Sequence, residues 1–214
     1  MLKNKLGEKP VLYTGQLPQQ VADIMVNRLN NLGYFDASVR SSVREHNKKV
    51  KVTYSVTVTR PYTIRSLDFP KDSSLISWKI RETQKETLLK PGTQYDLELL
   101  KAERQRIDAY LKNEGYYFFN PDYLLFTADS TVGDRSIALR LRVKRDSPSR
   151  ALTRYYMRHI YIYPSFNAAD SSGTRGDTLK IEGYDYIASD STFHAHTVLR
   201  CLFLKPGELY SRKG

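Results

Sequence analysis

The segment LKPGTQYDLELLKAERQRIDAYLKNEGYYFF, residues 89–119, decides how the rest of the chain is interpreted. Apolar side chains recur in it at steps of three and four residues, which predicts a helix with one buried face. We expect a turn at Pro91-Gly92 and a helix stop at Gly115, because glycine adopts the positive φ of a C-terminal cap at little cost. The aromatic run at residues 116–119 then predicts the start of a strand. The apolar helix positions are Leu97, Leu100, Ile107, Tyr110 and Leu111.

The same order of features occurs earlier in the chain. A helical pattern over residues 17–32 ends at Gly33, in a context that matches the one around Gly115. After each glycine the pattern predicts a hairpin of two strands. The strands of the first copy are expected at residues 35–43 and 50–58, and those of the second at residues 123–128 and 137–144. Alternation of apolar and polar residues predicts that each hairpin buries one face.

The features before the helix also recur. Residues 62–70 resemble residues 155–164, and both copies break the two-residue rhythm at the same place, which predicts a β-bulge. Residues 89–95 recur as residues 204–210. In the third copy these features are separated by an insertion at residues 165–191, rich in Asp, Ser and Gly, which we interpret as a protruding loop or hairpin. Strand-like pieces lie within it at residues 178–181 and 184–187.

The complete repeat is therefore strand, helix, turn, helix, glycine, strand, turn, strand, and the fold class is α+β. Residues 75–80 fit a short strand or the start of the first helix, and residues 81–89 are predicted to be helical. We predict three domains: a partial repeat at residues 1–60, a complete repeat at 61–147 and a partial repeat at 148–214. We interpret the chain as a piece of a longer tandem array.

Composition narrows the classes of protein. With 214 residues, 40% hydrophobic and 12% aromatic, the chain can form packed cores, which excludes a disordered tail. The net charge of +11 is spread along the chain, so a solvated mixed surface is expected, with attraction to an anionic partner as the alternative. The single cysteine, Cys201, excludes an intrachain disulfide. We find no apolar run long enough for a membrane-spanning helix and no signal-peptide pattern at residues 1–13.

A tandem β-α-α-β-β repeat with Asn-x-Gly-Tyr after its second helix and a Pro-Gly-x-x-Tyr turn before it resembles the POTRA domain. The likeness is best to the BamA/TamA-type outer-membrane proteins, in which POTRA repeats precede a β-barrel. Residues 5–13 resemble the Bacteroidetes branch, and the enlarged third copy resembles the repeat beside the barrel. The resemblance implies a three-stranded mixed sheet with two helices on one face. Its residues are Pro91, Gly92, Tyr95, Asp96, Arg104, Ile107, Leu111, Asn113, Gly115 and Tyr116, with the matching Leu29, Asn31, Gly33, Tyr34 and Phe35.

The resemblance also implies a function. It indicates a periplasmic part of an outer-membrane protein that assembles or translocates β-barrel proteins. Unfolded outer-membrane clients and accessory proteins or lipoproteins are then the partners, and the membrane is reached through a C-terminal β-barrel that these residues do not include. An exposed sheet edge can bind an extended client through its backbone N–H and C=O groups. The resemblance places that edge on the strand after the second helix, at Tyr123, Leu124, Leu125 and Phe126, and at Phe35, Ala37 and Val39.

The sequence also allows other interpretations. The candidate edge residues could be ordinary strand residues that pack on helices. The chain could be a periplasmic scaffold of two-partner-secretion or divisome type, which also uses POTRA repeats. A basic module for single-stranded nucleic acid is a further alternative, because the pI is near 9.6 and Arg140, Arg142 and Lys144 line one strand face. We expect no nucleic acid, because the basic residues are not concentrated on one strand.

Sites for catalysis or metal binding are not expected. His194, His196 and Cys201 could be metal ligands, but histidines two residues apart share a face only on a strand, and this segment approaches a predicted helix. The acidic segment at residues 129–134 lacks the ligand spacing of a calcium loop and is interpreted as a hairpin turn. No motif for nucleophilic, metal-dependent or phosphate chemistry occurs. We therefore expect no enzyme activity, no metal and no cofactor.

Overall fold

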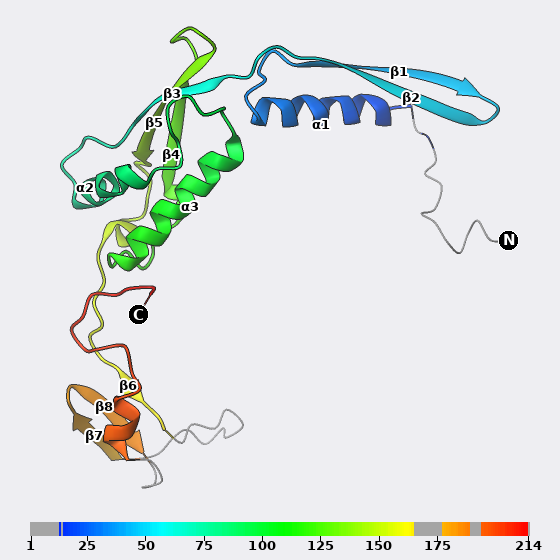
Figure 1. The fold of residues 1–214 in the computed structure, drawn as a ribbon. Helices are drawn as coiled ribbons and strands as arrows, with labels where there is room; N and C mark the ends of the chain where they lie inside the picture. The colour runs from blue at the N-terminus through cyan, green and yellow to red at the C-terminus, as the bar shows by residue number, and fades with distance from the viewer. Residues whose placement is uncertain (1–12, 14, 165–176, 189–193, 214) are drawn as a thin grey trace, which may run out of the picture. The chain divides into compact units, whose positions relative to one another are not determined.

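The computed structural model describes residues 13, 15–164, 177–188 and 194–213 (Figure 1). Residues 5–12, which carry most of the Bacteroidetes resemblance, lie outside them, as do residues 165–176 and 189–191 of the insertion. The elements are α1 (Leu17–Asn31), β1 (Ser38–His46), β2 (Lys49–Thr57), β3 (Thr63–Asp68), α2 (Leu75–Glu82), the 3-10 helix η1 (Thr83–Glu86), α3 (Leu97–Asn113), η2 (Pro121–Tyr123), β4 (Leu124–Asp129), β5 (Ser136–Val143), η3 (Ser149–Leu152), β6 (Tyr161–Ile162), β7 (Asp177–Ile181), β8 (Tyr184–Ala188) and α4 (Ala195–Leu199).

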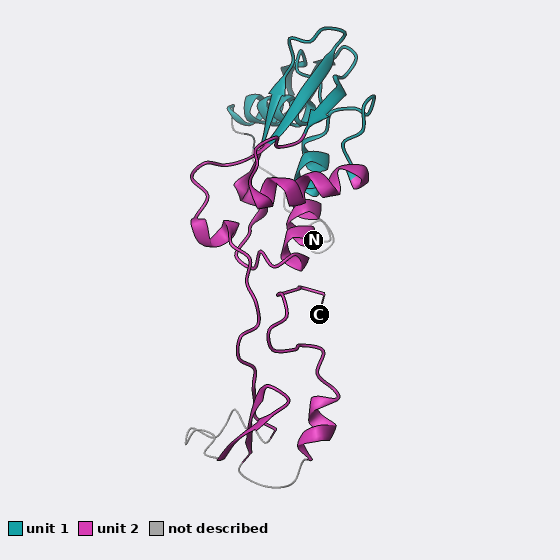
Figure 2. Cartoon of the chain, turned by 90° about the vertical axis from the view of Figure 1, so that its left-hand side faces the viewer, with its two compact units in different colours: residues 1–68, 87–103, 126–141 teal, residues 69–86, 104–125, 142–214 magenta. Residues whose placement is uncertain are grey.

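The chain divides into two compact units (Figure 2). Residues 1–68, 87–103 and 126–141 form unit 1, and residues 69–86, 104–125 and 142–214 form unit 2. The three repeats at residues 1–60, 61–147 and 148–214 remain a prediction.

The first helix and hairpin follow the predicted order with one correction. α1 ends at the predicted glycine: Gly33 has a φ of +85°, and the Tyr34 amide donates to the Leu29 carbonyl. The predicted strand at residues 35–43 is β1, which begins only at Ser38. The amide of Ala37 donates to the Tyr34 carbonyl, so the residues directly after the glycine form a turn instead of a strand.

The β1–β2 hairpin does not bury a face as its alternating sequence predicts. Val52 and Tyr54 are only half-buried, while Val43, Val50 and Val56 on the same face are exposed. Among the described elements, α1 packs against β1. The prediction of a buried face was wrong because alternation fixes where side chains point, and burial requires a layer that covers them.

The middle of the chain forms a three-stranded sheet in the order β3-β5-β4. β3 and β5 are parallel, and their register shifts between Ile64 and Ser66, which confirms the predicted bulge. With α2 and α3 between β3 and β4 in the chain, the element order is β-α-α-β-β, and the predicted α+β fold class is confirmed. The core of unit 1 consists of Ile64, Leu89, Leu100, Ile137 and Leu139.

The first helix of this repeat lies earlier than residues 81–89. α2 begins after Ser74, whose side chain accepts a hydrogen bond from the Ser77 amide as an N-cap. The carboxylate of Asp72 accepts hydrogen bonds from the Ser74 and Ser77 side chains, and these lower the Asp72 pKa. η1 follows α2, and the helix does not extend to Leu88 and Leu89, because the amides of these two residues donate to side chains and not to a preceding turn.

α3 and its glycine stop agree with the prediction, whereas the aromatic run does not. Gly115 has a φ of +95°. Residues 116–119 form a turn and not a strand, with the Phe119 amide donating to the Tyr116 carbonyl. Both of these rings are buried, so they fill the core where a strand was expected, and β4 begins only after η2.

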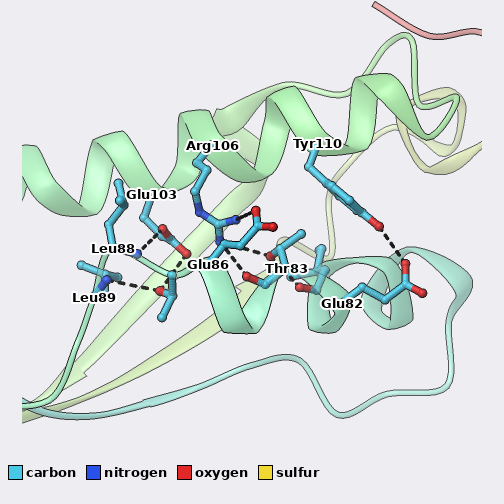
Figure 3. Close-up of polar contacts among 10 residues, drawn as sticks. Glu82, Thr83, Glu86, Leu88, Leu89, Glu103, Arg106 and Tyr110 are labelled. Atoms are coloured by element: carbon cyan, nitrogen blue, oxygen red, sulfur yellow. Dashed lines mark hydrogen bonds and ion pairs between the residues drawn. The ribbon is translucent and has the colours of Figure 1, made fainter. Parts of the chain in front are cut away.

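A buried carboxylate on α3 holds the segment that follows η1 (Figure 3). Glu103 is fully buried and accepts hydrogen bonds from the Thr87 hydroxyl at 2.9 Å and the Leu88 amide at 3.0 Å. Because Glu103 accepts from the Leu88 amide, it takes the place of the carbonyl that a continuing helix would supply. The segment therefore leaves the helical path here.

Further along α3, polar contacts tie this helix to α2 and η1 within unit 2 (Figure 3). The Tyr110 hydroxyl donates to the Glu82 carboxylate at 2.7 Å, and the Arg106 guanidinium donates to the Thr83 carbonyl at 3.2 Å. Burial and the hydrogen bond to Glu82 raise the pKa of Tyr110 to about 12. The same hydrogen bond, with one from Lys79, lowers the pKa of Glu82.

The last sheet has the order β6-β8-β7. β7 and β8 form an antiparallel hairpin, as predicted for the insertion, and Tyr184 and Tyr186 are buried. The strand predicted at residues 155–164 is much shorter: it consists of β6 and an isolated bridge from Tyr156 to Leu209. The insertion supplies the central strand, β8, so its hairpin is part of this sheet and does not protrude from it as predicted.

In unit 1, the backbone after α1 is bonded to two later segments. The carbonyl of Gly33 accepts a hydrogen bond from the Tyr62 amide at 2.9 Å, and the Tyr62 carbonyl accepts one from the Tyr95 amide at 2.8 Å. The ring of Phe35 lies 5.1 Å from that of Tyr62 and 5.3 Å from that of Tyr95. We call Gly33, Tyr62 and Tyr95 the first glycine joint.

Unit 2 repeats this arrangement after α3. The carbonyl of Gly115 accepts a hydrogen bond from the Tyr155 amide at 2.8 Å, and the Tyr155 carbonyl accepts one from the Tyr210 amide at 2.9 Å. The ring of Tyr117 lies 4.8 Å from that of Tyr210. We call Gly115, Tyr155 and Tyr210 the second glycine joint. The two joints use the segments that the sequence repeat aligns.

Replacement of Gly33 by alanine is expected to lower stability more than replacement of Gly133. Both glycines have positive φ, so both variants lose about 1–2 kcal/mol to backbone strain. Only at Gly33 would a Cβ approach backbone oxygens, at 3.1 Å from Tyr95 and 3.2 Å from Tyr62, which adds about 1–3 kcal/mol. Urea unfolding of the two variants tests this, and equal losses would contradict the close approach.

The Glu103→Ala variant is expected to lose about 1–3 kcal/mol of unfolding free energy, because the Leu88 amide and the Thr87 hydroxyl both lose their acceptor. Glu98→Ala on the same helix is the control: this carboxylate is 74% exposed, and its ion pair with Lys101 contributes less than about 1 kcal/mol. Denaturant midpoints and slopes measure both. A loss no larger than that of the control would contradict a structural role for Glu103.

Alkaline pH is expected to weaken the α2–α3 contact. The pKa of Tyr110 is raised from 10.0 to about 12, so its hydrogen bond contributes fully below pH 10 and is lost as the pH rises toward 12. The difference in unfolding free energy between the parent protein and Tyr110→Phe, measured by urea unfolding, should shrink as the pH rises from 10 to 12. Tyr156→Phe, at an exposed tyrosine, is the control. A difference that does not change with pH would refute the coupling.

Candidate protein-interaction edge

β4 forms one edge of the β3-β5-β4 sheet. The Lys144 amide donates to the Tyr123 carbonyl at 2.8 Å, and the Thr127 hydroxyl contacts the Arg140 carbonyl at 3.4 Å. Alternate residues of a strand direct their backbone groups to the same neighbouring strand. The backbone N–H and C=O groups of Leu125 and Thr127 therefore point toward β5. The backbone groups of the alternate residues Phe126 and Ala128 face away from the sheet.

The opposite edge of this sheet, on β3, is covered by the chain itself. The Ile64 amide donates to the Thr93 carbonyl at 2.8 Å, and the Gly92 amide donates to the Ile64 carbonyl at 2.7 Å. Thr63 forms an isolated antiparallel bridge with Gln94. Among the described residues, β4 has no such segment on its outer side, so β4 is the edge open to a partner.

The four residues predicted on this edge do not form one side-chain surface. Tyr123 lies in η2, half-buried, with its ring 5.8 Å from that of Phe119. Leu124 is buried, and its amide donates to the Pro121 carbonyl. Phe126 packs against the core of unit 1, whereas Leu125 is 43% exposed. What these strand residues offer to a partner is therefore mainly their backbone.

The three residues predicted in the first copy lie in different places. Phe35 is in the turn before β1 and contacts the rings of the first glycine joint. Ala37 precedes β1, and Val39 lies within it, opposite Val56 of β2. Of the three, only Val39 belongs to the strand, whose order β1-β2 makes it an edge.

A shallow cavity of about 210 Å³ lies at the end of β4. Acidic and basic side chains line it together: Asp68 and Asp129 beside Arg140. Hydrogen bonds from the Thr131 side chain and amide lower the pKa of Asp129, which keeps its carboxylate ionised. A mixed-charge cavity fits a polypeptide side chain better than a phosphate backbone. The other lining residues are Thr127, Ala128, Ala138 and Leu139.

The buried Glu103 was missed in the sequence. It occupies a position on the apolar stripe of α3, between Leu100 and Ile107, and a carboxylate at such a position is the signal that could have found it. Its carboxylate accepts from the Thr87 hydroxyl and the Leu88 amide, so we interpret Glu103 as a structural residue.

The metal-ligand candidates do not form a cluster. In the described part of the chain, no group of three or more His, Cys, Asp or Glu side chains could hold a metal ion. His196 lies in α4 beside Glu182, at 3.4 Å, while Cys201 is exposed beyond the helix. Within the same described residues, no helix has the length and apolar character to cross a bilayer.

Several solved structures are similar to this chain. The crystal structure of POTRA3-5 of Haemophilus influenzae BamA is 16% identical, covers 99% of this chain and 74% of its own, and has a TM-score of 0.46. BamA from Haemophilus ducreyi lacking POTRA domains 1-3 is 14% identical, covers 66% of this chain and 26% of its own, with a TM-score of 0.42. POTRA1-3 of the periplasmic domain of Omp85 from Anabaena is 14% identical, covers 98% and 71%, with a TM-score of 0.32.

A search of the curated proteins finds no match. Residues 1–58 match the POTRA family model, described as "Surface antigen variable number repeat". This match covers α1, the β1–β2 hairpin and Gly33 of the first glycine joint, the part in which the sequence motif Asn-x-Gly-Tyr first occurs. The resemblance stated from the sequence is confirmed for this part of the chain: residues 1–58 match the POTRA family.

Proposed function

We propose that this chain is a periplasmic scaffold of an outer-membrane protein that assembles or translocates β-barrel proteins. In this role β4 accepts an extended segment of an unfolded client, or of an accessory protein or lipoprotein, as an added strand. The proposal is carried by one observation: the β3 edge of the central sheet is covered by residues 92–95, and the β4 edge is open.

The geometry of β4 suits a partner of variable sequence. Phe126 and Ala128 direct backbone donors and acceptors outward, and main-chain pairing makes few demands on the partner's side chains. The cavity beside Ala128 offers room for one side chain of an added strand. Leu125 and Thr127 on the exposed face add contacts without fixing one sequence.

We further propose that the chain carries three POTRA repeats, at residues 1–60, 61–147 and 148–214. The two glycine joints support this division, because each ties the residue after the last helix of one proposed repeat to the start of the first strand and to the turn of the next repeat. In the proposed first repeat, β1 holds the place that β4 holds in the second. Two weak strand-accepting edges on one chain would bind a long client more tightly than either edge alone.

Ala128→Pro is expected to weaken client binding without loss of the fold. Proline removes an outward N–H while leaving the bonds of Thr127 to β5 intact, and proline is tolerated on the open side of an edge strand. Loss of one hydrogen bond, about 1 kcal/mol, predicts a roughly fivefold rise in Kd. The probe is a synthetic nine-residue peptide with alternating apolar and polar residues, titrated by NMR.

Ala128→Ser, which keeps the amide, is the matched control and should bind like the parent protein. Binding should also slow hydrogen exchange at the amides of Phe126 and Ala128. If both variants bind equally well while their melting temperatures stay unchanged, β4 is not the binding edge. A peptide that protects the amides of another strand would lead to the same conclusion.

A further inference from the structure

We infer that β4 selects the strand it accepts through two of its side chains, Leu125 and Asp129, and that it takes a segment in which a basic residue is followed four positions later by an apolar one. The inference rests on the proposed function, since it names the class of segment that the β4 edge accepts. β4 and its neighbours β5 and β3 all lie within the one complete β-α-α-β-β unit.

The two faces of β4 differ. Alternate residues of a strand lie on opposite faces of its sheet. Leu124 is buried and Phe126 packs against the core of unit 1, so both lie on the core side. Leu125, Thr127 and Asp129 therefore form a row on the other face, and all three are exposed. A strand added beside β4 places its own alternate side chains about 4.5–5.5 Å from this row.

The carboxylate of Asp129 is held in place and keeps one oxygen available. Its Oδ1 atom accepts hydrogen bonds from the Thr131 amide at 2.9 Å and the Thr131 hydroxyl at 2.6 Å. These bonds lower the pKa of Asp129, so the group is ionised at neutral pH. Among the described residues, Oδ2 has no hydrogen-bond or ion-pair partner. A basic side chain on an added strand can therefore bind this oxygen.

The surroundings of Asp129 leave a negative charge to be matched. The cavity of about 210 Å³ at this end of β4 is lined by two carboxylates, Asp68 and Asp129, and by one cation, Arg140. The strand register places Arg140 directly opposite Asp68, where opposite charges attract. The small side chains of Ala128 and Ala138 also line the cavity, which leaves room for the aliphatic part of a long basic side chain.

The other end of the row is apolar. Leu125 is 43% exposed, and an apolar side chain opposite it would remove this surface from water. Leu125 and Asp129 are four residues apart on one face, and residue-by-residue pairing transfers this spacing to the added strand. Antiparallel pairing, the more stable kind per residue, reverses the order along the partner. The basic residue of the partner therefore comes first.

This preference is opposite to that expected from the net charge of the chain. A charge of +11 attracts acidic peptides at long range. Tighter binding of a basic peptide therefore points to a local carboxylate. At about 0.15 M salt the Debye length is about 8 Å, so the long-range attraction is screened while pairs in contact remain.

Three nine-residue peptides test the inference. They have lysine, serine or glutamate at the third position, leucine at the seventh and threonine elsewhere. In NMR titrations at about 0.15 M salt, the lysine peptide should bind about threefold to tenfold more tightly than the glutamate peptide, with the serine peptide between them. Equal affinities, or tighter binding of the glutamate peptide, would overturn the inference.

Variants of the row identify the side chains responsible. Asp129→Asn keeps an acceptor for Thr131 and removes the charge, so it should abolish the difference between the lysine and glutamate peptides. Asp134→Asn, at an exposed carboxylate of the same turn, is the matched control and should preserve the difference. Leu125→Thr should remove the advantage of leucine over serine at the seventh position. A lysine preference that survives Asp129→Asn would contradict the assignment.

Two further measurements separate this inference from the proposed function. A nitroxide label beside the peptide lysine should broaden the amides of residues 128–131 more than those of Leu124 and Leu125. Bound peptide should also slow hydrogen exchange at Phe126 and Ala128. If no peptide protects these two amides, the proposed function fails and the inference with it. If all three peptides protect them with equal affinity, β4 still accepts strands, and only selection by side chains is overturned.

Discussion

This structure depends on one constraint: a glycine ends a helix, and another segment of the chain packs against that glycine. A Cβ at Gly33 would stand 3.1 Å from the Tyr95 carbonyl oxygen, and one at Gly115 would stand 2.5 Å from a Leu209 side-chain carbon. Both residues also hold positive φ. Because glycine alone combines this conformation with the absence of a Cβ, the hydrogen bonds from Tyr62 and Tyr155 can form at these two helix ends.

The joints also determine which sheet edge is available. The segment that bonds to Tyr62 in the first joint continues along β3 through Thr93 and Gly92, and so occupies the outer side of that strand. The edge on β4 is left open, on the far side of β5. A single packing arrangement therefore connects successive segments and leaves the β4 edge uncovered by the described residues. The polar contacts of Glu103 and Tyr110 hold α3 against η1, α2 and the segment that follows them.

Prediction from the sequence succeeded where local physics was sufficient. The helix at residues 17–32, the glycine stops and the bulge near Arg65 follow from periodicity and backbone conformation. It failed where aromatic residues follow a glycine. Phe35 and residues 116–119 read as strand starts, but in the structure they form turns whose rings pack inward or against a later segment. Aromatic residues favour strands because strands bury their rings, and a turn can bury these rings equally well.

The sequence by itself determined the order of elements, their repetition and the side of each element that is apolar. Only the tertiary structure decided which apolar sides are covered. β2 and β5 alternate alike, yet Leu139 is buried while Val56 is exposed, because β3 lies beside β5 and, within the described chain, has no counterpart beside β2. The burial of Glu103 also depends on a distant segment, because its carboxylate accepts a hydrogen bond from the amide of Leu88. Periodicity records the direction of a side chain, and burial depends on segments that are distant in the sequence.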